Sequence, residues 1–148
     1  MEIVLVLLVL IVAILIFRGL GFAGMHALVS WHTAARYGLA VMLLFTSSAH
    51  FTALKEDLIR MTPSWVPKPR EMVFFTGLCE FAGAIGLAIP ALQRAAGIAL
   101  ILFFIAVLPA NVHAAQAQVT LRGRPATPLW LRVPMQILFI GLAWWSTQ

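Results

Sequence analysis

Among the polar residues of this chain, Glu80 occupies the least favourable position for a charge. It lies inside residues 72–89, a run of 18 residues that is otherwise apolar apart from Thr76 and the thiol of Cys79. As a helix this run spans roughly 27 Å, close to the ~30 Å hydrocarbon core of a bilayer. A carboxylate at that depth costs at least about 2.5 kcal/mol, so it must be protonated, paired or hydrated. Ionisable groups in such positions typically belong to proton paths or ligand pockets.

Four other polar side chains are expected at a comparable depth. Counted from the side of two Pro-rich loops at about 1.5 Å per helical residue, the depths are roughly 5 Å for Arg132, 7 Å for His50, 10 Å for Asn111 and Gln136, and 15 Å for Glu80. The residues one helical turn from Glu80 are small, which is typical of a helix face in contact with other helices. The sequence therefore predicts a polar pocket with Glu80 at its base.

Two interpretations of this pocket stay open. In the first, the five side chains only hydrogen-bond across helices and fix the packing, with Glu80 protonated or paired to Arg132. In the second, they form a site in which His50 relays a proton between Glu80 and a bound quinone or another small apolar ligand. A heme is the other candidate cofactor, although the sequence has no Cys-x-x-Cys-His attachment motif. No metal is expected, because no spacing of His50, His113 and Glu80 fixes a coordination geometry.

Composition indicates a membrane protein. The chain is 62% hydrophobic and 10% charged, whereas soluble domains are roughly 45–50% apolar and about 25% charged. The net charge of +5 does not predict a nucleic-acid partner, because the basic residues sit in loops and no basic run carries interleaved aromatics. The expected partner is the lipid bilayer. With one cysteine, Cys79, the chain cannot form an internal disulfide or a redox-active dithiol.

Five apolar stretches predict helices that would position these residues: 3–17, 34–54, 72–89, 95–117 and 129–145. The first stretch has no basic residue before it and no clear cleavage site after it, so it reads as an uncleaved helix rather than a signal peptide. At roughly 22 Å it is short for a full span. The expected fold is an all-α integral membrane four-helix bundle in residues 34–148, preceded by an additional apolar helix and link in residues 1–33.

The distribution of Lys and Arg predicts the orientation in a cell membrane. Loops 55–71 and 118–132 carry seven of these residues, including Arg122 and Arg124, and the opposite side carries three. Because short basic loops stay in the cytoplasm, both Pro-rich loops and the N-terminus are predicted to be cytoplasmic in a multi-pass protein.

Several short segments, in the same order along residues 34–146, resemble the DoxX-like family of small membrane proteins. They are residues 48–51 (SAHF), 61–69 (MTPSWVPKP), 76–80 (TGLCE), 86–90 (GLAIP), 108–112 (LPANV) and 131–136 (LRVPMQ). The resemblance implies a four-helix membrane bundle, to which residues 3–17 are an addition. The family takes its name from a subunit of a thiosulfate:quinone oxidoreductase, and relatives are tied to redox maturation and membrane-protein assembly.

The resemblance therefore implies an accessory subunit in quinone-linked or other redox metabolism, working with a redox partner subunit or as a homo-oligomer. Because this chain has no redox-active residue pair, we expect it not to be an enzyme in isolation. The alternative is a non-catalytic assembly factor or scaffold. A proton-coupled transporter is a third hypothesis, disfavoured by the small size of the bundle.

Overall fold

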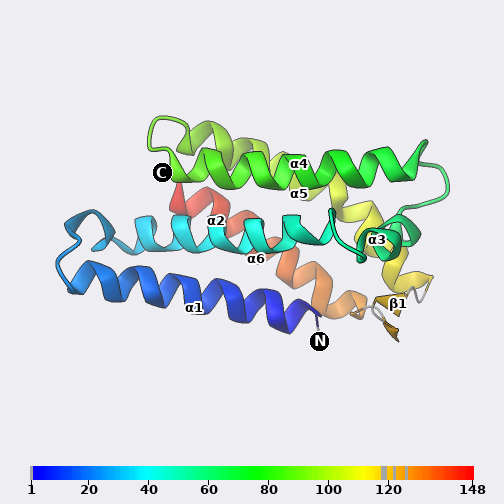
Figure 1. Ribbon diagram of the computed structural model, residues 1–148, viewed down its shortest axis with the longest axis horizontal. Helices are drawn as coiled ribbons and strands as arrows, with labels where there is room; N and C mark the ends of the chain where they lie inside the picture. Colours follow the sequence, from blue (N-terminus) through cyan, green and yellow to red (C-terminus); the bar gives the residue numbers. More distant parts are fainter. Residues whose placement is uncertain (1, 118–119, 122, 126) are drawn as a thin grey trace.

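The computed structural model describes residues 2–117, 120–121, 123–125 and 127–148, and it is helical apart from one short hairpin (Figure 1). The all-helical prediction is therefore confirmed. The elements in chain order are α1 (Glu2–Phe22), a 3-10 turn η1 (His26–Leu28), α2 (Trp31–Ala49), α3 (Lys55–Met61), α4 (Pro69–Ala88), α5 (Gln93–Gln116), β1 (Thr120–Leu121), β2 (Arg124–Pro125) and α6 (Leu129–Ser146).

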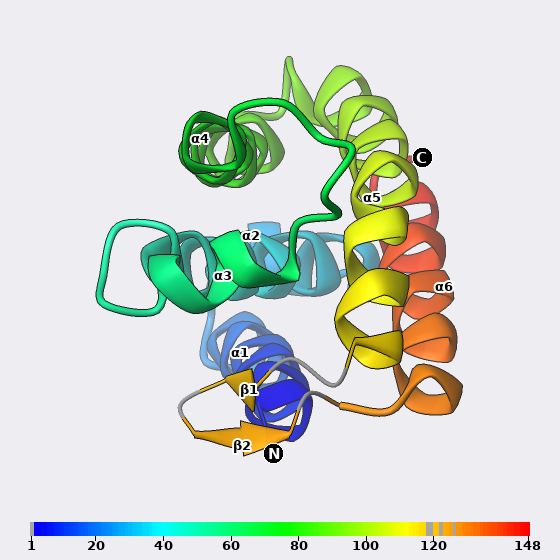
Figure 2. The same cartoon turned by 90° about the vertical axis from the view of Figure 1, so that its right-hand side faces the viewer.

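The five long helices run up and down along one axis, with α2 at the centre. Helix α2 packs against α1 on one side, and against α4 and α6 on the others. Helix α5 contacts both α4 and α6, so that α2, α4, α5 and α6 close a ring, and α1 lies outside it against α2 (Figure 2). In this ring α4 and α6 are diagonal to each other. The short helix α3 and the hairpin lie together at one end of the long axis (Figure 1).

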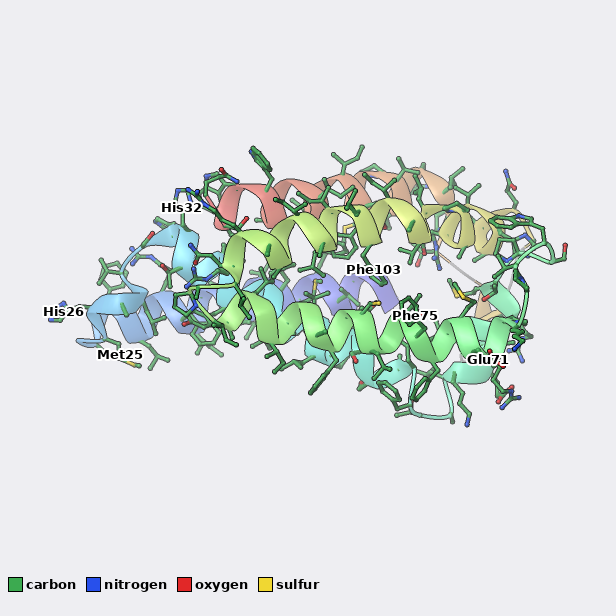
Figure 3. All side chains as sticks on the ribbon, turned by 90° about the horizontal axis from the view of Figure 1, so that it is seen from above. Met25, His26, His32, Glu71, Phe75 and Phe103 are labelled. Carbon is green, nitrogen blue, oxygen red and sulfur yellow. The ribbon has the colours of Figure 1, made fainter. Side chains whose placement is uncertain are left out.

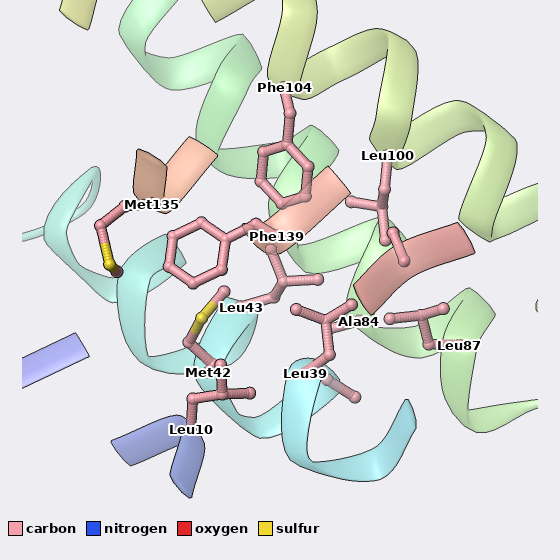
Figure 4. Close-up of a cluster of buried hydrophobic side chains, with 12 residues drawn as sticks. Leu10, Leu39, Met42, Leu43, Ala84, Leu87, Leu100, Phe104, Met135 and Phe139 are labelled. Atoms are coloured by element: carbon pink, nitrogen blue, oxygen red, sulfur yellow. The ribbon is translucent and has the colours of Figure 1, made fainter. Parts of the chain in front are cut away.

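Small residues allow the helices to approach closely. A Cβ added at Gly38 of α2 would lie 2.4 Å from the Ile14 side chain of α1, and one at Gly83 of α4 would lie 2.5 Å from Leu100 of α5. Five helices contribute to the buried core (Figure 4), which comprises Leu10, Leu39, Ala40, Met42, Leu43, Ala84, Leu87, Leu100, Phe104, Met135, Phe139 and Ala143. The small residues beside Glu80 face inward, as predicted, while Phe75, Leu78 and Ile85 are exposed.

Three helices, α1, α4 and α5, are long and apolar enough to cross a membrane, by length and composition. Their outer faces expose large apolar side chains, among them Leu8 and Ile11 of α1 and Phe74 of α4. Oxygen and nitrogen atoms gather at the two ends of the long axis, near the labelled His26 at one end and Glu71 at the other (Figure 3). The apolar middle and polar ends follow the pattern expected for membrane helices.

The prediction for the first helix was wrong in length. The sequence predicted residues 3–17, too short for a full span, whereas α1 has 21 residues and continues through Arg18 to Phe22. The guanidinium of Arg18 donates to the carbonyl of Val29 and lies over the rings of Phe22 and Trp31. Because these contacts accommodate the charge, Arg18 does not end the helix.

The prediction for the second helix was also wrong at its end. It was expected to continue to residue 54, but α2 ends at Ala49, and residues 50–54 turn the chain into the unpredicted helix α3. The amide of His50 bonds to the carbonyl of Ser47, which tightens the last turn of α2. Helix α3 carries Glu56 and Asp57 in its first turn and Arg60 in its last, which matches the helix dipole.

Candidate functional site

A cavity of about 660 Å³ lies at the α3 end of the molecule, mainly between α2, α3 and α6. The structure brings all five predicted pocket residues to its lining: His50, Glu80, Asn111, Arg132 and Gln136. They come from the residue after α2 and from α4, α5 and α6. The depth count placed these residues in the same half of the membrane. The structure groups them at one end of the molecule because neighbouring helices begin or end there. Their use as a binding site stays a prediction.

His50 and Glu80 form one wall of the cavity, built by α2 and α4. Nε2 of His50 lies 3.7 Å from Oε1 of Glu80, and both side chains are about one-tenth exposed, at 11% and 14%. The hydroxyl of Thr46 donates to Oε2 of Glu80 over 2.8 Å. Nδ1 of His50 lies 2.7 Å from the carbonyl oxygen of Val73. Since a carbonyl only accepts, Nδ1 donates its proton to Val73, which leaves Nε2 facing the Glu80 carboxylate.

A glycine brings the two helices close enough for this pairing. A Cβ added at Gly77 of α4 would lie 2.5 Å from the Cβ of His50, well inside contact distance. The hydroxyl of Ser47 donates to the Gly77 carbonyl over 3.0 Å and holds the end of α2 in place. Glu80 follows Gly77 by one helical turn, so this contact places His50 beside the Glu80 carboxylate.

Arg132, Asn111 and Gln136 form the opposite wall, built by α5 and α6. Arg132 donates from Nε to the Thr127 carbonyl and from Nη1 to Oδ1 of Asn111, both over 2.9 Å. Nδ2 of Asn111 donates to Oε1 of Gln136 over 3.2 Å, and Nε2 of Gln136 donates to the carbonyl of Phe104. These bonds tie the three side chains to one another and to the backbone.

The interpretation that pairs Glu80 with Arg132 was therefore wrong. Glu80 accepts a hydrogen bond from Thr46 of α2 and forms an ion pair with His50, the residue after α2, whereas Arg132 is bonded to Asn111 of α5. The physical reason is the order of helices in the ring. Helices α4 and α6 are diagonal, so each polar residue finds its partner on a neighbouring helix instead.

A second cavity of about 280 Å³ adjoins the first and extends between α4 and α5. Apart from its polar junction with the larger cavity, its lining is mainly apolar, including Trp65, Val66, Phe103 and Val107. The two cavities share eight lining residues: Thr46, His50, Leu58, Met61, Glu80, Asn111, Gln136 and Phe139. His50 and Glu80 of one wall, and Asn111 and Gln136 of the other, therefore lie at the junction of the two cavities.

The sequence interpretation missed some residues of this site. Asp57, Leu58 and Met61 line the cavity from the unpredicted helix α3. Thr127 contributes through its backbone carbonyl, which no sequence pattern marks. No group of three or more His, Cys, Asp and Glu residues suited to a metal ion occurs in the described part of the chain.

The fold and the cavity together define a helical protein with three helices able to cross a membrane and a cavity, lined in part by polar side chains, at the α3 end of the molecule. The chain belongs to the family described as a domain of unknown function, DUF8561, whose model matches residues 39–147. The match includes all five pocket residues and leaves α1 outside. No curated protein and no solved structure matches the chain.

Proposed function

We propose that this protein is a DoxX-like multi-pass membrane protein that binds a quinone in its cavity and serves as an accessory subunit in quinone-linked or other redox metabolism. The observation that carries the proposal is the placement of His50 and Glu80 at the junction of the larger cavity with the smaller, mainly apolar one. A quinone has a ring that accepts hydrogen bonds, which fits the polar side chains at the junction, and an apolar chain, which fits the mainly apolar smaller cavity.

The membrane location is supported by the distribution of tryptophans as well as by the three apolar helices. Trp65 and Trp130 lie at the α3 end and are 72% and 74% exposed. Trp31, in the first turn of α2, and Trp144 and Trp145, in the last turn of α6, lie at the other end of the molecule and are also exposed. Tryptophan is enriched at both membrane–water interfaces, so these two groups mark the two faces of the bilayer. Helices α2 and α6 then complete a four-helix membrane bundle with α1 as the additional span.

The orientation with the α3 end in the cytoplasm follows from charge. Lys55, Arg60, Lys68 and Arg70 all lie at that end, which agrees with the positive-inside rule. Arg122, which also entered the sequence-based assignment, lies outside the described residues. The candidate pocket would then open toward the cytoplasmic half of the membrane.

The chemistry follows from the protons that the α2–α4 wall can hold. Reduction of a quinone to a quinol takes up two electrons and two protons, so the ring needs proton donors beside its oxygens. His50 and Glu80 exchange protons at Nε2 and at the carboxylate, and Val73 fixes the orientation of the imidazole. Electrons would come from a partner subunit, since the one cysteine of this chain cannot form a dithiol.

Binding of quinone to the purified protein tests this proposal. We expect a co-purified quinone, detected by absorbance and mass spectrometry, and rebinding of a ubiquinone analogue after it is stripped. Glu80→Gln should weaken rebinding about tenfold, the effect of removing one charge-assisted contact of about 1.4 kcal/mol. Absence of quinone together with equal binding by the wild-type and Glu80→Gln proteins would refute the proposal. A Soret band in place of quinone would identify heme as the cofactor.

The second candidate is a non-catalytic assembly factor or scaffold. It is favoured by one observation: each of the five pocket side chains already contacts another protein group. In that case Glu80→Gln should leave function intact in cells, because the amide still accepts the Thr46 bond. Loss of cellular function in a stably folded Glu80→Gln protein would exclude the scaffold.

A further inference from the structure

Of the charged residues that line the large cavity, Arg132 has no oppositely charged partner among the described residues. Asp57 forms an ion pair with Arg60, and Glu80 lies beside His50. In the described part of the chain, no carboxylate forms an ion pair with Arg132. Arg132 lines the cavity and is 8% exposed, so a fixed positive charge is buried beside a ligand-sized space. Arginine stays protonated at any ordinary pH.

The guanidinium of Arg132 has a fixed orientation as well as a charge without an ionic partner. Nε and Nη1 donate to the Thr127 carbonyl and the Asn111 side-chain oxygen, which are uncharged acceptors. The remaining nitrogen, Nη2, has no hydrogen bond to any residue that the structure describes. A buried cation is unfavourable unless an anion accompanies it, and arginine is well suited to bind carboxylate and phosphate oxygens. The group that would complete this arrangement is a negatively charged oxygen at Nη2.

We propose that the cavity binds an anionic amphiphile, with a carboxylate or phosphate group on Arg132 and an apolar chain in the smaller cavity between α4 and α5. The shared lining of the two cavities, which includes Asn111 and Gln136, connects the charged end to the apolar end. Ala106 and Ala110 of α5 leave room along the smaller cavity. The charged end of this ligand would bind the α5–α6 wall, whereas the ring of the proposed quinone would bind the α2–α4 wall. The two ligands would place their apolar chains in the same smaller cavity, so they would exclude each other.

Titration of the purified full chain in an uncharged detergent tests the ligand class. The probes are oleate, dioleoylphosphatidylglycerol, oleyl alcohol and inorganic phosphate, with binding followed by tryptophan fluorescence and native mass spectrometry. We expect oleate or the phospholipid to bind at least ten times more tightly than oleyl alcohol or inorganic phosphate. Preference for oleate identifies a free carboxylate as the ligand, and preference for the phospholipid identifies a lipid headgroup. The proposal would be overturned if oleyl alcohol bound as tightly as oleate and the phospholipid. It would also be overturned if inorganic phosphate bound as tightly as oleate and the phospholipid.

Charge variants test the role of Arg132. Arg132→Gln should weaken oleate or phospholipid binding at least tenfold and leave oleyl alcohol unchanged, while Arg132→Lys should retain part of the affinity. The matched control is Arg70→Gln, which removes the same charge from an exposed ion pair with Glu56 at the same end of the molecule. Equal loss of anion binding in Arg132→Gln and Arg70→Gln would contradict a specific site.

A second variant keeps the test decisive even if Arg132→Gln fails to fold. Asn111→Asp places a carboxylate next to Nη1 and neutralises the Arg132 charge in place. It should abolish anion binding without loss of the folded state, and unchanged anion affinity in this variant would overturn the proposal. For the apolar chain, Ala110→Phe should weaken oleate binding about tenfold and leave hexanoate unaffected. Unchanged oleate binding in Ala110→Phe would refute the placement of the chain.

Discussion

The two walls of the large cavity hold similar polar side chains in different ways. On the α2–α4 wall, a base and an acid, His50 and Glu80, face each other across 3.7 Å, with hydroxyl groups around them. On the α5–α6 wall, Arg132 and Gln136 are tied to backbone carbonyls and to Asn111. The first wall places a carboxylate and an imidazole side by side. The second presents a fixed charge in a fixed orientation.

Because of this difference, we expect the α2–α4 wall to contribute to both stability and function, and Arg132 of the α5–α6 wall to contribute mainly to function. The acid and base of the α2–α4 wall satisfy each other, so they contribute to packing as well as to chemistry. Arg132 has only uncharged partners in the described part of the chain, so its burial adds little to stability. A residue that is costly to keep and is nevertheless oriented toward a cavity is more easily explained by a ligand than by packing.

The largest stability effect is expected from Glu80→Leu. Removing one partner of a largely buried ion pair leaves the other unpaired, so His50 loses its neighbouring charge and the Thr46 hydroxyl loses the Glu80 acceptor. We expect a loss of about 2–4 kcal/mol in the free energy of unfolding, measured by SDS titration in bicelles with tryptophan fluorescence. Glu80→Gln is the matched control and should lose about 1 kcal/mol or less. Equal losses in both variants would show that the pair does not stabilise the α2–α4 wall.

Gly77→Val should have the next largest effect, since it separates the two helices that build the same wall. The new side chain would meet the Cβ of His50, and overpacking of this kind costs about 1–3 kcal/mol. The His50–Glu80 pair should also separate, so ligand binding on this wall should fall together with stability. Gly141→Ala on α6 serves as the control, because nothing lies within 4 Å of its added Cβ. A stable Gly77→Val protein with full ligand binding would contradict the close approach of α2 and α4.

The sequence was sufficient to place the five long helices, apart from the ends of α1 and α2, and to group the five pocket residues at one end of the molecule, and the reason is physical. Hydropathy reports which stretches avoid water, and a constant rise per residue converts position into depth. The sequence could not predict which polar side chains pair with each other, because whether Glu80 contacts His50 or Arg132 depends on which helices are neighbours in the ring. Depth is a property of one helix, whereas pairing is a property of the packing between helices.

Two further elements escaped the sequence for local reasons. Helix α3 has seven residues and is rich in charge, so it gives no hydropathy signal, yet it supplies Asp57, Leu58 and Met61 to the cavity. The extension of α1 through Arg18 depends on a contact with Val29 and on the rings of Phe22 and Trp31, which only the folded chain brings together.

On the opposite wall, Arg132→Met should change stability by less than about 1 kcal/mol. It removes hydrogen bonds to Thr127 and Asn111 but also removes a buried charge without an ionic partner, and these contributions oppose each other. The measurement is the same SDS titration as for Glu80→Leu, and the contrast between the two variants tests the comparison directly. A loss of about 3 kcal/mol or more would mean that Arg132 is a structural residue, which would weaken the case for a ligand on this wall.

The smallest effect is expected from Thr46→Val, which keeps the shape of the side chain and removes one hydrogen bond to Glu80. Hydrogen bonds between helices in membranes contribute about 0.6 kcal/mol on average, and a loss of that size is expected here. The sharper measurement is a double-mutant cycle with Glu80→Gln. If Thr46 acts through the carboxylate, the stability loss of the double variant should be smaller than the sum of the two single losses. The reason is that the amide introduced by Glu80→Gln already weakens the bond that the valine removes. Strict additivity would mean that Thr46 stabilises α2 through its other bond, to the Leu43 carbonyl, and takes no part in the α2–α4 wall.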